Sequence, residues 1–299
     1  MGLSADGTRF LLYAKTQGVR FTRTATLGRQ GLHLTADELG KNLRDFGHDA
    51  SGAEGMLRGA GGFAEPFLET LGAEEVCSFD ASGFEGASYV HDFNFPVGAG
   101  LRGRFTAVID GGTLEHIFDF PTAVRNCMEM LEVGGHFLGS SPVNNFAGHG
   151  LYQFSPELFF RVFSEPNGFR VRRMIVFEGR PAKSWFEVAD PAAVGERVAF
   201  ANSKPATLLV LAEKVAAVEV FSSPPRQSDY TALWNPGETT AAAGPSAALR
   251  ADENLFWRAA RRLYGSAPEP FKNLYRRLPL PHRHGAFSNS KYFRRMRVP

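Results

Sequence analysis

Short apolar runs alternate with helix-like patterns along the first two thirds of the chain. The runs expected to form strands span residues 22–27, 75–79, 87–90, 105–109, 136–139, 169–177 and 206–212. Helical patterns cover residues 36–46, 63–71, 121–131 and 155–163. This alternation predicts a doubly wound, Rossmann-like α/β fold, a mostly parallel sheet with helices on both faces. The last two runs are expected to add an antiparallel hairpin at the edge of the sheet.

Two of the helical patterns begin with recognisable capping residues. Thr35 precedes the pattern at 36–46, and threonine is a good N-cap because its hydroxyl accepts a hydrogen bond from a free backbone N–H group. Ser155-Pro156-Glu157 supplies a cap, a proline in the first turn and an acidic side chain near the positive end of the helix dipole. These signals predict where both helices start.

Composition divides the chain into four parts. Residues 1–21 are an ambiguous leader, and residues 22–220 contain the predicted α/β domain. Residues 221–249 are rich in Pro, Ser, Thr, Gly and Ala, which is typical of a linker or surface loop. Residues 250–299 form a basic C-terminal extension that holds 12 Lys and Arg against three acids. The rest of the chain holds 21 basic and 28 acidic residues, so the net charge of +2 conceals an asymmetry.

The basic extension has two interpretations. Clustered Lys and Arg bind phosphates, and the interleaved aromatic residues suit base stacking or an anionic lipid surface. Alternatively, the aromatic side chains pack on the rest of the protein and the arginines pair with its excess acids. We favour the second interpretation and expect no nucleic-acid partner. The aromatic residues concerned are Phe271, Tyr275, Phe287, Tyr292 and Phe293.

The sequence also bears on the compartment. It has no apolar stretch of about 18 residues and no secretory signal, so neither a membrane span nor export is predicted. Cys77 and Cys127 fall in a predicted strand and a predicted helix. We expect both to be buried, reduced thiols in a cytoplasmic protein.

Polar or glycine-rich residues follow each of the first five predicted strands. Ligands of open α/β sheets bind outside the carboxyl ends of the strands, so these residues are expected to surround one nucleoside-bearing ligand. Taken singly, each glycine or aspartate has a structural alternative as a turn former or helix cap. The strand ends are Gly28-Arg29-Gln30-Gly31, Asp80, Asp92 with Asn94, the segment 110–116, and Ser141-Pro142-Val143-Asn144-Asn145.

The segment 105–142 carries the most specific pattern. It reads strand-Asp110, then Leu114-Glu115-His116, then Met130-Leu-x-x-Gly-Gly-x-Phe137. This pattern resembles the fourth and fifth strands, and the helix between them, of the class I S-adenosylmethionine-dependent methyltransferases. The resemblance extends over roughly residues 22–180. It implies a Rossmann-like domain that binds S-adenosylmethionine and transfers its methyl group to a small-molecule acceptor, such as a sugar or another hydroxylated metabolite.

The resemblance also implies roles for individual residues. The loop Gly28, Arg29, Gln30, Gly31 would contact the methionine part of the cofactor, and Asp80 with Ala81 the ribose. Asp92 and Phe93 would lie near the adenine, and Asp110, Gly111 and Gly112 near the amino end of the methionine. Glu115 and His116 would close over the cofactor or line the acceptor site.

The glycine loop departs from the family pattern. Leu27-Gly-Arg-Gln-Gly31 lacks the usual acidic residue and the G-x-G-x-G spacing, and Arg29 is bulky where a close backbone approach favours glycine. A non-catalytic relative that serves as a binding or scaffold protein is therefore an alternative. An RNA methyltransferase is a second alternative, which the basic extension alone supports.

The stretch after the fifth predicted strand is the candidate acceptor site. His149, flanked by Gly148 and Gly150, is a candidate general base, and His116 competes for that role. Methyl transfer also proceeds by alignment alone, with the proton lost to water. Asn144, Asn145, Tyr152 and Gln153 are expected to orient the acceptor. The structural alternative is that His149 caps a loop and Tyr152 packs on the sheet.

The sequence predicts no metal site. His282 and His284 stand in a basic, proline-bounded segment without partnering acids or cysteines. The remaining histidines outside the candidate site lack the spacing of metal ligands. They are His33, His48, His91 and His136.

Overall fold

The computed structural model describes residues 2–179, 181–182, 184–234, 266–270 and 287–298. The chain divides into two compact units. The first comprises Met1–Val188, Ser203–Gln227 and Arg295–Pro299, and the second Ala189–Asn202 and Ser228–Arg294. The sequence also favours a basic helix over residues 253–264. This segment, His282 and His284, and most of the predicted linker lie outside the described residues.

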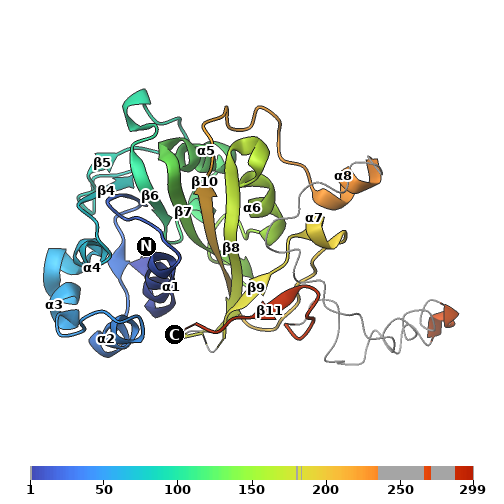
Figure 1. Ribbon diagram of the computed structural model, residues 1–299, viewed down its shortest axis with the longest axis horizontal. Coiled ribbons are helices and arrows are strands. Elements are labelled where there is room, and N and C mark those ends of the chain that lie inside the picture. Colours follow the sequence, from blue (N-terminus) through green and yellow to red (C-terminus); the bar gives the residue numbers. More distant parts are fainter. Residues whose placement is uncertain (1, 180, 183, 235–265, 271–286, 299) are drawn as a thin grey trace. The chain divides into compact units, whose positions relative to one another are not determined.

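Five parallel strands form the centre of the first unit (Figure 1). They lie side by side in the order β7-β6-β2-β4-β5. Numbered along the chain, this order is 5-4-1-2-3, the arrangement of a doubly wound sheet whose strand order reverses between the first and fourth strands. The predicted fold class is confirmed, and the switch point lies between β2 and β6. The strands are β2 (Arg23–Leu27), β4 (Glu75–Asp80), β5 (Tyr89–Val90), β6 (Phe105–Asp110) and β7 (Leu131–Asn144).

Three further strands that lie wholly in the first unit extend the sheet beyond β7. They are β8 (Phe169–Glu178), β9 (Phe186–Val188) and β10 (Ala206–Lys214). The predicted antiparallel pair is present, but its position at the edge is wrong, because β10 lies between β7 and β8 and is antiparallel to both, and β9 continues beyond β8. Nearly every residue of β10 is buried, which explains its continuous apolar run: an inner strand is covered on both faces.

Helices pack on both faces of this sheet. Ala107 and Ile109 of β6 and Leu138 of β7 share a core with residues of the first helices of the chain. Phe137, which alternates with Leu138 along β7, stacks on Phe163 after α6, with ring centroids 4.7 Å apart. The helices of the first unit are α1 (Ala5–Thr16), α2 (Ala36–Asp45), α3 (Ala53–Arg58), α4 (Glu65–Thr70), α5 (Phe120–Met130) and α6 (Pro156–Val162).

The predicted capping residues begin their helices as expected. The Thr35 hydroxyl accepts a hydrogen bond from Glu38 N, and the Glu38 carboxylate accepts one from Thr35 N, which makes a complete capping box on α2. The Ser155 hydroxyl accepts from Leu158 N at the start of α6. The helix α3 inside the glycine-rich stretch before α4 was not predicted from the sequence.

The first 21 residues belong structurally to the first unit. Leu3 of β1 (Gly2–Leu3) and most of α1 are part of its hydrophobic core. The strand β1 pairs in parallel with β3 (Gly31–Leu32), which directly follows the glycine loop. The chain therefore does not pass from the glycine loop straight into a helix, because β3 comes between the loop and α2.

The described residues of the second unit have their own contacts. Its helices are α7 (Pro191–Val194) and α8 (Ser228–Trp234), and α8 lies within the predicted linker. Phe200 packs against Phe287 and Phe293, with centroids 5.1 and 5.8 Å away, and Tyr292 donates a hydrogen bond to Glu196. Tyr292 and Phe293 are buried and are not displayed for base stacking. The strand β11 (Phe293–Arg295) lies near the end of the chain. None of the helices within the described ranges has the length and apolar character needed to cross a bilayer.

Candidate functional site

The predicted ligand-binding strand ends meet at one edge of the sheet. Leu27, the last residue of β2, pairs with Phe79 of β4 on one side and with Asp110 of β6 on the other. Asp110 in turn pairs with Gly139 of β7. This register brings Gly28, Asp80 and Asp110 to neighbouring positions beside the switch point, where ligands of doubly wound folds bind.

Gly28 and Arg29 occupy the turn after β2 in different ways. Gly28 has a φ of +71°, a conformation that favours glycine, and its N–H donates to Phe79 O at 2.6 Å. The Arg29 guanidinium donates to Glu65 Oε1 at 2.7 Å and to Glu85 O at 3.0 Å, and lies 4.1 Å over the ring of Phe63. Arg29 thus ties the glycine loop to the start of α4 and to the loop after β4.

The Gln30 side chain fills the space between the ends of β2 and β6. It is buried, and its Nε2 donates to Leu27 O at 2.5 Å. A Cβ atom at Gly111 would lie 2.1 Å from Gln30 Oε1, so the amide packs directly against the backbone after β6. That oxygen has no hydrogen-bond partner among the described residues. A larger residue at position 111 would therefore require the Gln30 side chain to move.

Asp80 and Asp92, at the end of β4 and just after β5, each accept hydrogen bonds within the turn that follows them. Asp80 Oδ1 accepts from Ser82 N at 2.9 Å. Asp92 Oδ1 accepts from the backbone and side-chain nitrogens of Asn94, at 2.9 and 2.8 Å, which lowers the pKa of Asp92. Ala81 is exposed, whereas Phe93 is buried against Phe79.

Asp110 and Glu115 form a buried carboxylate pair. Each side chain is only 1% exposed. A single tight turn that contains Gly111 and Gly112 separates the two residues along the chain. Asp110 Oδ1 accepts from Thr113 N at 2.8 Å and from Leu114 N at 3.2 Å. Burial raises the pKa of Asp110 to about 6, and burial together with the charge of Asp110 raises the pKa of Glu115 to about 8. Within the described part of the chain, Asp110 Oδ2 and Glu115 Oε2 accept no hydrogen bond.

Two histidines lie next to this pair. Glu115 and His116 belong to a short 3₁₀ turn (Leu114–His116), and His149 comes from the loop after β7. His149 Nε2 lies 3.4 Å from Glu115 Oε1, and the His116 and His149 ring centroids are 5.2 Å apart. Burial, and then the proximity of His149, lower the pKa of His116. The two histidines that compete for the base role in the sequence therefore share one site.

Backbone contacts hold the His149 loop against the 3₁₀ turn. Leu151 N and Tyr152 N both donate to Glu115 O, at 2.9 and 3.1 Å. A Cβ atom at Gly150 would lie 2.9 Å from the same oxygen and 3.3 Å from His116 Cε1, so only glycine permits this approach. Glu115, His116 and His149 each offer one ligand atom within 4.8 Å of the others. The sequence did not predict this three-residue group, because the residues meet only after the chain folds.

The other predicted acceptor residues make contacts that shape the loop. Asn145 has a φ of +60° and donates to Lys204 O at 2.9 Å, and Gln153 Oε1 accepts from Phe146 N at 2.8 Å. Tyr152 donates to Phe118 O at 2.7 Å and stacks on Phe154. Asn144 is the last residue of β7 and pairs with Ala206. These side chains stabilise the segment that carries His149.

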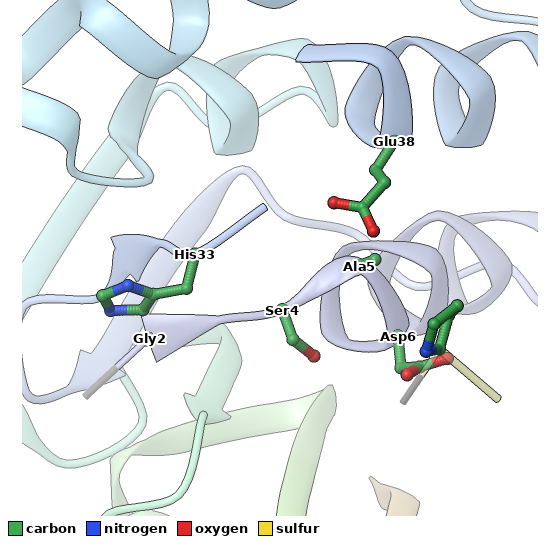
Figure 2. A pocket seen from close by; sticks show the side chains of 7 residues that line it. Gly2, Ser4, Ala5, Asp6, His33 and Glu38 are labelled. Atoms are coloured by element: carbon green, nitrogen blue, oxygen red, sulfur yellow. The ribbon is translucent and has the colours of Figure 1, made fainter. Parts of the chain in front are cut away.

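A separate pocket opens at the starts of α1 and α2 (Figure 2). It has a volume of about 360 Å³, and none of the predicted cofactor-binding residues lines it. Figure 2 shows the side chains of Ser4, Asp6, His33 and Glu38 around it. The full lining is Gly2, Ser4, Ala5, Asp6, His33, Glu38 and Pro181.

Comparisons with known proteins give distant structural likenesses. No family model matches the chain, and no curated protein matches it. Among solved structures, the N-methyltransferase NodS from Bradyrhizobium japonicum WM9 is 11% identical, with 71% of this chain and 96% of that chain covered and a TM-score of 0.40. A Burkholderia thailandensis 1,6-didemethyltoxoflavin-N1-methyltransferase, crystallised with S-adenosylhomocysteine, is 12% identical, with 71% and 78% covered and a TM-score of 0.40.

A third neighbour catalyses a different reaction. The branched-chain polyamine synthase from Thermus thermophilus, crystallised with 5′-methylthioadenosine, is 14% identical, with 75% and 59% covered and a TM-score of 0.35. At these identities and TM-scores the likenesses carry no conclusion about the activity of this chain. The Rossmann-like α/β class of the first unit rests on its own strand order.

Proposed function

We propose that this protein is an S-adenosylmethionine-dependent methyltransferase with a small, hydroxylated acceptor. The observation that carries the proposal is the register of the strand ends, which brings Gly28, Asp80 and Asp110 together at the switch point. The resemblance of residues 105–142 to the class I methyltransferases supplies the identity of the ligand. Neither the glycine loop nor the acidic residues would support the proposal alone.

The buried polar atoms near the switch point suit a cationic ligand. Gln30 Oε1, Asp110 Oδ2 and Glu115 Oε2 are hydrogen-bond acceptors with no partner among the described residues. Unpaired buried acceptors are costly, and an ammonium group would satisfy them. S-adenosylmethionine carries an ammonium group and a sulfonium, so we propose that Asp110, with Gln30, binds its amino end. When bound, the cofactor supplies an already activated methyl group.

The residues after β7 are assigned to the acceptor. His149 has a half-exposed side chain beside Glu115 and is positioned to accept the proton of an acceptor hydroxyl. The remaining task of the protein is to hold donor and acceptor in line, since correct proximity and orientation lower the barrier of such a transfer. Tyr152 and Gln153 act by fixing the loop that carries His149.

One observation favours a non-catalytic binding protein as a second candidate. The Gln30 side chain packs on Gly111, in the turn where a ligand would approach the backbone most closely. A cofactor that needs this space would have to displace Gln30. The two candidates therefore differ in whether the wild-type protein binds S-adenosylmethionine.

Calorimetric titration with S-adenosylmethionine and S-adenosylhomocysteine tests the proposal. We expect binding by the wild type, and Asp80→Ala to weaken it at least about tenfold, since the loss of a hydrogen-bonding carboxylate costs about 1.5–3 kcal/mol. The matched control is Asp49→Ala, which removes an exposed carboxylate in the loop before α3 and should bind as the wild type does. Absence of binding to both ligands by the wild type would contradict the enzyme proposal. Binding gained only in Gln30→Gly would support the non-catalytic candidate.

A methyl-labelled donor can then be used to identify the acceptor. Incubation of the protein with metabolite extracts and a methyl-labelled donor should transfer label to a low-molecular-weight product. His149→Ala should slow this transfer if the histidine acts as a base. An equal rate in this variant and the wild type would remove His149 from the catalytic step.

A further inference from the structure

Glu115, His116 and His149 combine two imidazoles and one carboxylate in one cluster. Their ligand atoms lie within 4.8 Å of one another, and the closest pair, Glu115 Oε1 and His149 Nε2, is 3.4 Å apart. Two histidines and one carboxylate form a common three-residue ligand set for divalent transition-metal ions, with further positions left for water or substrate. We propose that these three residues bind a divalent transition-metal ion of the Zn²⁺ class.

The distances between the three ligand atoms suit this proposal once one side chain moves slightly closer to the other two. Ligand atoms bound to one ion at about 2.0–2.2 Å lie roughly 3.0–3.6 Å from one another. The Glu115–His149 pair already has this spacing, so only His116 must move closer to the others. The side chains of both histidines are exposed, so the protein interior does not enclose them on every side.

Glu115 provides an independent reason for a cation at this place. The residue is 1% exposed, and its Oε2 has no hydrogen-bond partner within the described part of the chain. Asp110 is a second buried carboxylate one turn earlier in the chain, and its Oδ2 is also without a partner among the described residues. Two buried acids with unpaired oxygens must either keep their protons or have a cation beside them, and the described residues place no Lys or Arg in ion-pair contact with either.

The backbone is built to keep the ligands together. The two hydrogen bonds from the His149 loop to Glu115 O, and the contact of Gly150 with Glu115 and His116, fix the loop on the 3₁₀ turn. Two ligands thus come from the turn after β6, and one comes from the loop after β7.

Ion binding does not depend on the proposed methyl transfer, but it would change the chemistry of that step. A metal-bound His149 cannot act as a base, because its lone pair is used on the ion. A bound ion lowers the pKa of a coordinated hydroxyl and so favours loss of the acceptor's proton directly. This role rests on the proposed function.

Metal titration of tag-free, chelator-treated full-length protein tests the inference. Calorimetry with ZnCl₂ should show one bound ion per chain, and thermal unfolding should shift to higher temperature with Zn²⁺. Loss of an outer-shell partner alone costs about 10- to 100-fold in metal affinity, so His149→Ala, His116→Ala and Glu115→Gln should each weaken binding at least about tenfold. His91→Ala removes a partly buried histidine outside the cluster and is the matched control.

Co²⁺ in place of Zn²⁺ gives a second measurement. Its visible absorption reports nitrogen and oxygen ligands directly, and the spectrum should change in His149→Ala but not in His91→Ala. Because His149 is half exposed, its variant should fold even if Glu115→Gln does not. The inference is overturned if the wild type binds neither ion, or if His149→Ala and His116→Ala bind both ions as the wild type does. Failure of S-adenosylmethionine binding with intact Zn²⁺ binding would contradict only the proposed function.

Discussion

Glu115 illustrates how a single residue can carry both a structural cost and a function. Its carboxyl group is buried beside Asp110, and only one of its oxygens has a close polar neighbour, His149 Nε2. A carboxylic acid in such surroundings avoids the cost of charge by keeping its proton, unless a cation is supplied. The state of Glu115 therefore depends on pH and on what is bound.

This dependence predicts the effect of Glu115→Gln on stability in the presence of a chelator. The pKa of Glu115 is raised from 4.5 to about 8 by burial and by Asp110. Between these values the folded protein holds a proton that the unfolded chain releases, so the wild type loses stability as pH rises, by at most about 1.4 kcal/mol per pH unit for this group. Glutamine does not titrate. In urea unfolding, the free energy of unfolding of Glu115→Gln should rise relative to that of the wild type from pH 5 to pH 8. A difference between the two proteins that stays constant with pH would contradict the raised pKa.

At the scale of elements, local signals predicted helix starts better than strand neighbours. Thr35 and Ser155 marked their helices because a capping residue acts on adjacent backbone groups. The inner position of β10 was not predictable, since pairing order depends on the whole sheet. The pair Gly134-Gly135 in the sequence predicts a change of chain direction, and the structure has an irregularity there: Gly134 has a φ of +84°, and the register with β6 jumps from Phe105–Leu131 to Ala107–His136. A Cβ at Gly135 would be 2.9 Å from Glu132 O and 3.0 Å from Phe105 O.

The His149 loop gives a matched pair of glycine substitutions. In Gly150→Ala the new methyl group would meet Glu115 O at 2.9 Å, and backbone atoms cannot move aside cheaply. In Gly148→Ala it would meet nothing within 4 Å. We expect a loss of about 1–3 kcal/mol in the free energy of unfolding for Gly150→Ala, as for other overpacked sites, and little change for Gly148→Ala. Chemical denaturation measures both, and equal effects would show that the loop is not held against Glu115.

At the scale of the whole molecule, the sequence predicted the place of the site better than its contacts. The carboxyl ends of parallel strands share one edge, so Gly28, Asp80 and Asp110 could be expected together from their positions after apolar runs. The packing of Gln30 on Gly111 and the meeting of His149 with Glu115 depend on side-chain placement, which periodicity does not encode. The departure of the loop from G-x-G-x-G indicates that larger side chains occupy this turn. The side chain that fills it is Gln30, whereas Arg29 points to Glu65 and Glu85.

The two cysteines report on the folding of the first unit as a whole. Cys77 of β4 and Cys127 of α5 are free and buried, as the sequence predicted. Burial raises the pKa of Cys77 to about 11 and that of Cys127 well above its usual range, so almost no reactive thiolate exists at pH 8. Both should react with a thiol reagent at least about 100-fold more slowly than free cysteine, which has a pKa of about 8.5.

Because the two cysteines come from different parts of one core, their exposure should be cooperative. With increasing urea, both thiols should become reactive over the same concentration range in which the far-ultraviolet circular dichroism is lost. Fully denatured protein should yield two reactive thiols per chain, since neither cysteine is in a disulfide. Rapid labelling of Cys77 in the native protein would mean that β4 is open to solvent. The strand register that brings Asp80 beside Gly28 would then not hold in solution, and the proposed cofactor site would lose its geometric basis.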